Sequence, residues 1–362
     1  MHGADPLNPA DGSRRAAATL DWDALERATH VDSAGRNLAR LAVGGRPWDT
    51  GHLAAAALDL AQHARRVIVV SGFCRRSSTG MTAETDGPPG ALFLARALLA
   101  LGIDVLLVSD RYGVPLLEAG CDHLGLGGTI THEMPIEQYA ADDALPESDR
   151  WCEDFFSAAA LGATHLVAIE RPGPSHTPGS LARQSRTGPA PLERFEREVP
   201  TADYNRCHNM RGERIDPWVA KTEQLFAWIE RQRAAITTIG IGDGGNEIGM
   251  GAIAWEVLTG ALGSPVAGRI ACRVPCDHLL LAGVSDWGAY GLALATAVLR
   301  GAGAEAAAWD APSQAELIRA LVDRAGAVDG VTGEHAATVD GLELDVYLAA
   351  LVRLRKVLGL KS

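Results

Sequence analysis

Short runs of apolar residues alternate along the chain with longer stretches in which apolar residues recur at helical spacing. The short runs have the length and the β-branched content of strands that are buried on both faces. They lie at residues 67–71, 105–109, 165–169, 236–240, 269–272 and 278–282. The helical spacing predicts helices over residues 89–101, 147–161, 218–233, 247–259, 290–300, 314–324 and 342–357.

Strands that are apolar throughout and are separated by helices are typical of a parallel sheet that is covered on both faces. We therefore predict an α/β fold, with a doubly wound, mostly parallel sheet in a three-layer sandwich. Apolar residues also recur at helical spacing between Leu20 and Leu60, which predicts extra helices before the first strand.

The domain organisation follows from composition. Residues 1–18 are rich in Pro, Gly, Asp and Ser and are predicted to form a disordered tail, while residues 19–362 are predicted to form one α/β domain. One segment, 171–204, breaks the pattern, because six prolines between residues 171 and 200 exclude a strand or a long helix. We expect a long loop there, either a variable surface insertion or a lid over the site.

Charge and composition narrow the class of partner. The 362 residues carry a formal net charge of −12, which argues against nucleic acid or an anionic membrane as the main partner. We expect a small-molecule substrate, and the sequence allows a homo-oligomer. The six cysteines are scattered, as expected for buried free thiols in a reducing compartment. With no secretory signal and no apolar stretch that could span a bilayer, the expected location is the cytoplasm.

The most polar segments follow the predicted strands. Asp86 lies in the turn segment after the first strand, Asp110 ends the second, Glu170 ends the third, and a glycine-rich loop at 240–251 ends the fourth. Each of these by itself fits a helix cap or a salt bridge. In an open α/β sheet, however, ligands bind outside the carboxyl ends of the strands. Together these segments predict one acidic, glycine-lined pocket.

The loop GIGDGGNEIGMG at 240–251 contains a G-x-G-x-x-G string between a strand and a helix, as dinucleotide sites do. Asp243 and Glu247 lie where a pyrophosphate would bind and would repel it, and no acidic residue closes the following strand. Three interpretations stay open: a dinucleotide site, a tight turn in which Asn246 caps a helix, and a polar catalytic loop. We favour the last.

With this loop and five shorter motifs, the sequence resembles the D-glutamate cyclase family over roughly residues 67–358. The shorter motifs are ETDGPPGA at 84–91, IER at 169–171, NMRG at 209–212, GVSDWGAYGLA at 283–293 and VDGL at 339–342. The resemblance implies an α/β hydro-lyase that interconverts D-glutamate and 5-oxo-D-proline with loss or gain of water.

The sequence departs from the family pattern in three places. Longer family members resemble a fusion to a hydro-lyase-like domain, which has no counterpart in these 362 residues. The Pro-rich stretch between Arg171 and Asn209 matches the family poorly, and Asp286 stands where members often carry Asn.

Ring closure of glutamate requires a neutral α-amine to attack the γ-carboxyl carbon and an oxygen to leave as water. We expect Asp243 and Glu247 to transfer protons, with Asn246 as a third catalytic residue. The backbone N–H groups of 242–245 are expected to stabilise the oxyanion, and Arg211 with Arg171 to hold the α-carboxylate. The full set of expected substrate-binding residues is Asp86, Gly87, Glu170, Arg171, Asn209, Arg211, Gly244, Gly245 and Ser285.

So many carboxylates around an anionic substrate pose a charge problem. Two unit charges about 4 Å apart repel by about 4 kcal/mol at an effective dielectric constant near 20. Protonated carboxyls, arginines or a divalent cation could relieve this. Mg²⁺ or Mn²⁺ suits oxygen ligands, and the candidate ligands are Asp243, Glu247, Glu170 and Asp110. No organic cofactor is expected.

Two other functions remain open. One is a nucleotide-dependent oxidoreductase that uses the glycine loop, and the other is a non-catalytic small-molecule sensor on the same fold.

Overall fold

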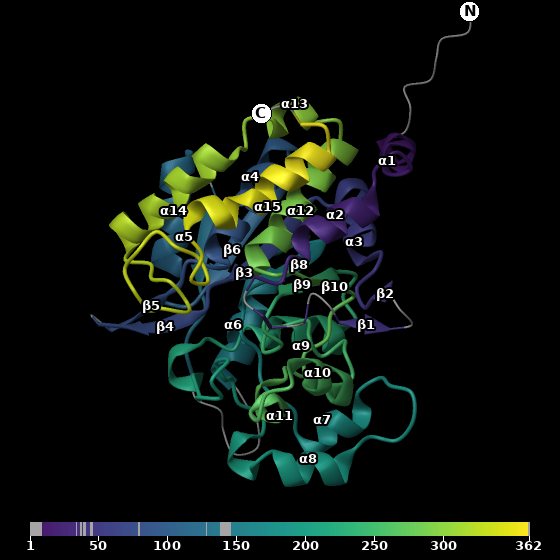
Figure 1. Ribbon diagram of the computed structural model, residues 1–362, viewed down its shortest axis with the longest axis vertical. Coiled ribbons are helices and arrows are strands. Elements are labelled where there is room, and N and C mark those ends of the chain that lie inside the picture. Colours follow the sequence, from purple (N-terminus) through teal and green to yellow (C-terminus); the bar gives the residue numbers. More distant parts are fainter. Residues whose placement is uncertain are drawn as a thin grey trace, which may run out of the picture.

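The computed structural model describes residues 9–360, except 34, 37, 39–40, 44–45, 79, 128 and 138–145. Its centre is a six-stranded sheet in which all neighbouring strands are parallel (Figure 1). In chain order the strands are β3 (Arg66–Ser71), β6 (Asp104–Ser109), β7 (Ile130–Glu133), β8 (His165–Ile169), β9 (Thr237–Gly242) and β10 (His278–Leu281). The predicted α/β class and doubly wound parallel sheet are confirmed.

The strand order in space is β10-β9-β8-β3-β6-β7. The chain starts in the middle at β3, winds outward through β6 to β7, and then returns to the other side of β3 to add β8, β9 and β10. This is the strand order of dinucleotide-binding folds, and its winding direction reverses between β3 and β8. A crevice forms at the carboxyl ends of the strands where the direction reverses, and ligands bind there.

Helices cover both faces of the sheet because alternate strand residues point to opposite sides. Val67 and Val69 of β3 belong to one hydrophobic cluster, whereas Ile68 and Val70 belong to another. The first cluster contains side chains of α3 (His52–His63), α4 (Pro88–Ala100), α5 (Val114–Leu124), α12 (Ser285–Leu299), α14 (Ala311–Ala325) and α15 (Leu344–Val357). The second contains side chains of α6 (Pro146–Ser157), α9 (Glu223–Gln232) and α10 (Trp255–Leu262).

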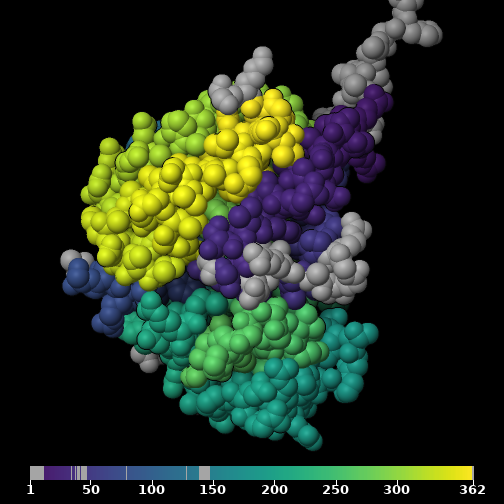
Figure 2. Space-filling model, viewed as in Figure 1, coloured from purple at the N-terminus to yellow at the C-terminus, as the bar shows by residue number. Residues whose placement is uncertain are grey.

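The beginning of the chain differs from the prediction of a tail over 1–18. Residues 1–8 lie outside the described part, but α1 (Pro9–Ala17) is helical and packs against α3 and α12. The Ser13 hydroxyl donates to the Leu299 carbonyl at 3.1 Å. The Ala-rich second half of this segment favours a helix. A second helix, α2 (Trp22–Thr29), lies beside α15, so both ends of the chain share one face (Figure 2).

The Pro-rich segment 171–204 also differs from the prediction of a long loop. It contains two short helices, α7 (Pro178–Arg183) and α8 (Leu192–Glu198), and a 3₁₀ turn at Thr201–Asp203. Phe195 of α8 is fully buried against Trp255 at a ring distance of 5.4 Å. The prolines begin and separate these helices, and the segment lies beside α10 and α11 (Ala267–Ile270) at the bottom of the view in Figure 1. None of residues 171–204 lines the main cavity described below, so the structure gives no support to a lid.

Two smaller predictions are wrong, and two elements were missed. Residues 269–272, predicted as a strand, overlap helix α11 (Ala267–Ile270), and the helix predicted from residue 247 begins only at Trp255. The residues between them form turns and isolated bridges instead of a helix. Gly251 lies so close to another part of the backbone that a Cβ there would be 2.3 Å from the Arg273 carbonyl oxygen. The edge strand β7 and the helix α5 were not predicted. β7 has only four residues, and half of them are polar.

The remaining elements are small. They are β1 (Ala42–Val43), β2 (Arg46–Pro47), β4 (Cys74–Ser77), β5 (Gly80–Ala83), α13 (Gly303–Ala306) and a 3₁₀ turn at Asp216–Trp218. All six cysteines are free thiols, as predicted, and five are buried. Across the described residues, no helix combines the length and apolarity needed to cross a membrane.

Candidate active site

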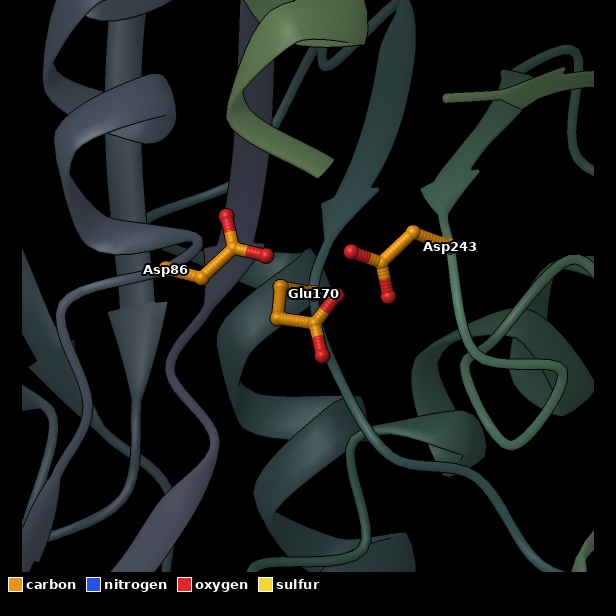
Figure 3. Close-up of side chains that lie close together, drawn as sticks. All are labelled: Asp86, Glu170 and Asp243. Carbon is orange, nitrogen blue, oxygen red and sulfur yellow. The ribbon is translucent and has the colours of Figure 1, made fainter. Parts of the chain in front are cut away.

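Three carboxylates meet at the crevice between the two halves of the sheet (Figure 3). Asp86 immediately precedes the glycine that caps α4, Glu170 follows β8, and Asp243 follows β9. One oxygen of each lies within 4.8 Å of an oxygen of the other two, and all three side chains are buried. The structure therefore brings together three residues that lie far apart in the sequence, as the strand-end argument predicted.

Asp86 is held by the first turn of α12. Its carboxylate accepts hydrogen bonds from the backbone N–H groups of Ser285 at 3.3 Å and Asp286 at 3.1 Å. The next residue, Gly87, has a positive φ of 93°, and a Cβ there would lie 2.7 Å from the Glu170 Cβ. Gly87 therefore provides the close approach of the α4 turn to Glu170, rather than a ligand group.

Glu170 lies at the exact end of β8 in the left-handed region, with a φ of 45°. The Ser285 hydroxyl donates to its carboxylate, so Ser285 links Asp86 and Glu170 through its backbone and its side chain. A left-handed backbone costs a non-glycine residue free energy, and such residues cluster at functional sites. Glu170 also lines the main cavity described below.

Asp243 is paired with an arginine that the sequence analysis did not identify. Arg36 donates to one Asp243 oxygen and forms a second ion pair with Asp340 at 3.0 Å. Asp340 belongs to the VDGL turn and has a φ of 53°. The other Asp243 oxygen, Oδ2, is buried and has no hydrogen-bond partner among the described residues. One Asp243 oxygen is thus available for a ligand or a proton.

Burial raises the pKa of Asp86, Glu170 and Asp243 well above the usual range of a carboxyl group, and neighbouring carboxylates raise each pKa further. Arg36 partly opposes this effect and lowers the pKa of Glu170 and Asp243. Glu84 behaves in the same way, since burial and Asp340 raise its pKa. Burial and mutual repulsion therefore favour the protonated forms of these carboxyls, and a cation among them would favour the ionised forms.

Glu247 organises the glycine loop. Its carboxylate accepts the backbone N–H groups of Asp243 at 3.2 Å, Gly244 at 2.6 Å and Gly245 at 2.7 Å. These N–H groups were predicted to bind the oxyanion, but the loop turns them onto its own side chain. A Cβ at Gly244 would lie 2.8 Å from both Asn246 Oδ1 and Met210 Sδ, so glycine permits this tight turn.

One of the three carboxylates, Glu170, lines a cavity of about 550 Å³, whereas Asp86 and Asp243 are packed behind its lining residues. Its floor contains buried polar side chains, namely those of Glu84, Glu170, Asn246 and Asp340. Asn246 donates to the His208 carbonyl at 2.8 Å, which holds this side chain at the wall. The outer part contains the predicted Asn209 and Arg211 and three further arginines, Arg75, Arg76 and Arg214. The predicted acidic pocket is therefore acidic at its floor and basic at its rim.

Arg171 and Asp110 lie outside this cavity. Arg171 is fully buried, pairs with Asp110 at 2.7 Å, and donates to the carbonyls of Gly72 and Ala220 and to the Thr222 hydroxyl. Each of the three guanidinium nitrogens thus has a partner within the protein. The structure corrects the prediction that Arg171 contacts substrate and that Asp110 ligates a metal: their bonds tie the end of β3 to the segment before α9.

Four residues of the site were missed by the sequence analysis. Glu84 and Asp340 lie inside the motifs ETDGPPGA and VDGL, so the motifs contained a signal that was assigned to turns. Arg75 follows β3 in a polar stretch to which the sequence analysis assigned no role. Arg36 lies between the apolar residues from which the early helices were predicted, and no feature of the sequence indicates its role.

Comparison with known proteins gives two findings. The sequence model of the family described as D-glutamate cyclase-like, C-terminal, matches residues 25–182 and 194–355. The chain is also 29% identical over 295 residues to human "D-glutamate cyclase, mitochondrial". That similarity covers 82% of this chain and 41% of the human protein, so the chain spans about two fifths of the length of this relative.

Proposed function

The chain belongs to the D-glutamate cyclase-like family, and from this premise we propose that it is a lyase that interconverts D-glutamate and 5-oxo-D-proline, or a closely related amino diacid and its lactam. One observation supports this proposal above the others. Three buried carboxylates cluster at the sheet crevice, and one of them, Glu170, lines a cavity with a basic rim. A substrate with an amine at one end and a free carboxylate at the other complements this separation of charge.

The reaction requires two protons to leave the substrate ammonium. The nitrogen forms a bond to the carbon of the γ-carboxyl group, one oxygen of that group leaves, and both protons depart with that oxygen as water. Carboxyl groups whose pKa is raised toward neutrality are suited to this transfer. In our proposal Asp243 takes one proton from the ammonium through its unpartnered Oδ2, and Glu170 delivers one proton to the leaving oxygen. The second proton of the nitrogen then passes to the same oxygen, and Asp243 returns its proton to Glu170, so that water leaves and both carboxyls recover their starting states.

Arg36 supplies the positive charge that the reacting carboxyl needs. Its guanidinium is fixed between Asp243 and Asp340 at the floor of the cavity. Because the N–H groups of the glycine loop bond to Glu247, we assign stabilisation of the tetrahedral oxyanion to Arg36 instead. Glu247 and Asn246 then act as positioning residues, since they hold the loop that presents Asp243.

We also propose a divalent cation, Mg²⁺ or Mn²⁺, at Asp86, Glu170 and Asp243. Their oxygens lie close enough to bind one ion, which would take the place of the protons that Asp243 and Glu170 otherwise exchange. Burial first, and the neighbouring carboxylates second, raise the pKa of these groups, and a cation would relieve the repulsion between them. A bound cation would polarise the γ-carboxylate. Compared with the set expected from sequence, Asp86 replaces Asp110 and Glu247, whose carboxylates are bonded elsewhere.

The hydrogen bonding of the glycine loop argues against the alternative function, a nucleotide-dependent oxidoreductase. A pyrophosphate would need the N–H groups that Glu247 already accepts. The proposed ring closure involves no change of oxidation state, so it needs no redox cofactor. The non-catalytic sensor is separated from the lyase by turnover alone.

The experiment incubates the purified protein with D- and L-glutamate and with D- and L-5-oxoproline, with and without Mn²⁺, and follows the products by chiral chromatography. We expect the D pair to reach the same ratio from either side. Asp243→Asn, which preserves shape, should lower kcat at least about a hundredfold. Binding without consumption of any of the four compounds would favour the sensor and contradict the lyase.

A further inference from the structure

We propose that Arg75 and Arg211 form a clamp at the rim of the cavity that binds the α-carboxylate of the substrate and of the product. The inference deepens the proposed function and rests on it. It adds a residue that the sequence analysis did not single out, and it fixes which end of the substrate faces the acidic floor.

The two guanidinium groups converge on a single neutral atom. Nη2 of Arg75, on β4, donates to the Val331 carbonyl oxygen at 3.3 Å, and Nη2 of Arg211 donates to the same oxygen at 3.4 Å. All three residues line the cavity. Among the described residues, neither guanidinium has a carboxylate within salt-bridge distance, and Nε of Arg75 is buried without a hydrogen-bond partner.

The other cavity arginines are already engaged. Arg36 pairs with Asp243 and Asp340, Arg214 pairs with Asp203 at 3.3 Å, and Arg76 lies over the ring of Trp218. Two cations that share one carbonyl oxygen leave most of their donor groups unused. A carboxylate can accept from both planar forks at once, and such charge-assisted bonds are stronger than bonds to a neutral carbonyl.

The clamp orients the substrate. Ring closure consumes the amine and the γ-carboxyl group, so the α-carboxylate is the one charged group that substrate and product share. When Arg75 and Arg211 hold it at the rim, the reacting groups extend toward Glu170 and Asp243 at the floor. The same clamp then serves both directions of the reaction. The site should accept amino diacids and lactams with a free α-carboxylate and reject their α-amides.

The test compares Arg75→Gln and Arg211→Gln with a matched control, Arg269→Gln. Arg269 pairs with Asp203 at 3.6 Å and lies outside the cavity, so its loss removes one nearby charge without touching the clamp. Kinetics are measured with D-glutamate and with its α-amide, D-isoglutamine. We expect each clamp variant to raise KM for D-glutamate at least about tenfold, with kcat within about threefold, and to lose the preference for the acid over the amide.

The control should keep KM and the preference of the wild-type protein. An equal effect of all three substitutions would indicate a diffuse electrostatic field and overturn the clamp. Unchanged KM in both clamp variants would overturn it as well. Arg75→Lys, which keeps the charge but loses the planar fork, should fall between Arg75→Gln and the wild-type protein.

Calorimetry separates failure of the clamp from failure of the proposed function. Its probes are 5-oxo-D-proline and the corresponding carboxamide, which differ only at the clamped group. If the wild-type protein turns over no substrate but binds the acid at least about tenfold more tightly than the amide, and both clamp variants lose this preference, the clamp stands without the lyase. Wild-type binding without preference, or no binding of either probe, overturns the clamp.

Discussion

Asp86 and Asp286 cap each other's helices. Asp86, just before α4, accepts the N–H groups of Ser285 and Asp286 at the start of α12, while Asp286 accepts those of Gly87 at 3.0 Å and Gly90 at 2.7 Å at the start of α4. The Tyr347 hydroxyl donates to Asp286 at 2.6 Å. Both helix dipoles thus point at one pair of buried carboxyls. This exchange sets the position of Asp86 relative to the other two carboxylates of the site.

The capping pair predicts how stability depends on pH. Burial raises the pKa of Asp286 to about 7 and raises that of Asp86 well above its usual range. Between about pH 4 and pH 7 the folded protein therefore binds more protons than the unfolded chain, so its stability falls as pH rises through this window. The slope is about 1.4 kcal/mol per pH unit for each proton of difference.

Urea unfolding between about pH 5 and pH 8 measures this slope. Asp286→Asn keeps an oxygen for the two glycine N–H groups and removes one of the two titrating carboxyls, so its stability should vary less with pH than that of the wild-type protein. An identical slope in the variant would show that the pair does not titrate in this range.

Arg36 predicts a shift in the pH dependence of activity. Its guanidinium beside Asp243 lowers the pKa of that carboxyl against the effect of burial. In Arg36→Gln the pKa of Asp243 should rise further, which moves the acidic limb of the pH profile of kcat/KM to higher pH. Loss of the charge at the reacting carboxyl should also lower kcat at least about tenfold. Arg36→Lys should restore part of both effects, and a profile equal to that of the wild-type protein would remove Arg36 from the reaction.

The sequence predicted the location of the site better than the roles of its residues. Asp86, Glu170 and Asp243 could be placed together because the carboxyl ends of parallel strands meet at one edge of a sheet. The adjacent Glu170 and Arg171 show the limit of that argument. The side chain of Glu170 lines the cavity, whereas that of Arg171 is buried away from it. The backbone of Glu170 has left-handed φ, and residue type alone does not predict this conformation.

The fold shows a similar division. Strands that are buried on both faces were predicted because their apolar runs are uninterrupted, whereas β7 at the sheet edge has too few apolar residues to stand out. Arg36 reaches the floor of the cavity, and its role there depends on tertiary contacts with Asp243 and Asp340. Long-range pairing of this kind has no local signature in one sequence.

The proposed cation predicts a stabilisation that depends on metal concentration. Mn²⁺ at about a hundred times its dissociation constant should stabilise the folded protein by about 2.7 kcal/mol, which a thermal melt detects. Glu170→Gln should weaken the shift, whereas Asp110→Asn should retain it, because Asp110 pairs with Arg171 outside the cluster. Each shift is measured against the metal-free form of the same variant. Full activity of the wild-type protein after exhaustive chelation, with no metal left bound, would contradict the proposal.

Glu247 should behave as a positioning residue. Gln at this position has one acceptor oxygen instead of two, so it leaves part of the loop N–H groups unsatisfied, at a cost of about 1–3 kcal/mol in the free energy of unfolding. We expect Glu247→Gln to lower kcat about a hundredfold while the limbs of the pH profile keep their positions. Asp243→Asn should instead abolish the limb that Asp243 sets. Loss of the same limb in both variants would show that Glu247 itself transfers protons.

Substitution of Arg171 distinguishes a structural role of this residue from a role in substrate binding. Arg171→Met leaves the buried carboxylate of Asp110 without its ion pair, which should cost about 3–5 kcal/mol in the free energy of unfolding. The folded fraction should keep the KM of the wild-type protein, because Arg171 does not line the cavity. The double variant Arg171→Met/Asp110→Asn removes the stranded charge and should recover part of the lost stability in urea unfolding. A KM raised about tenfold in Arg171→Met at unchanged stability would instead support the substrate contact expected from sequence.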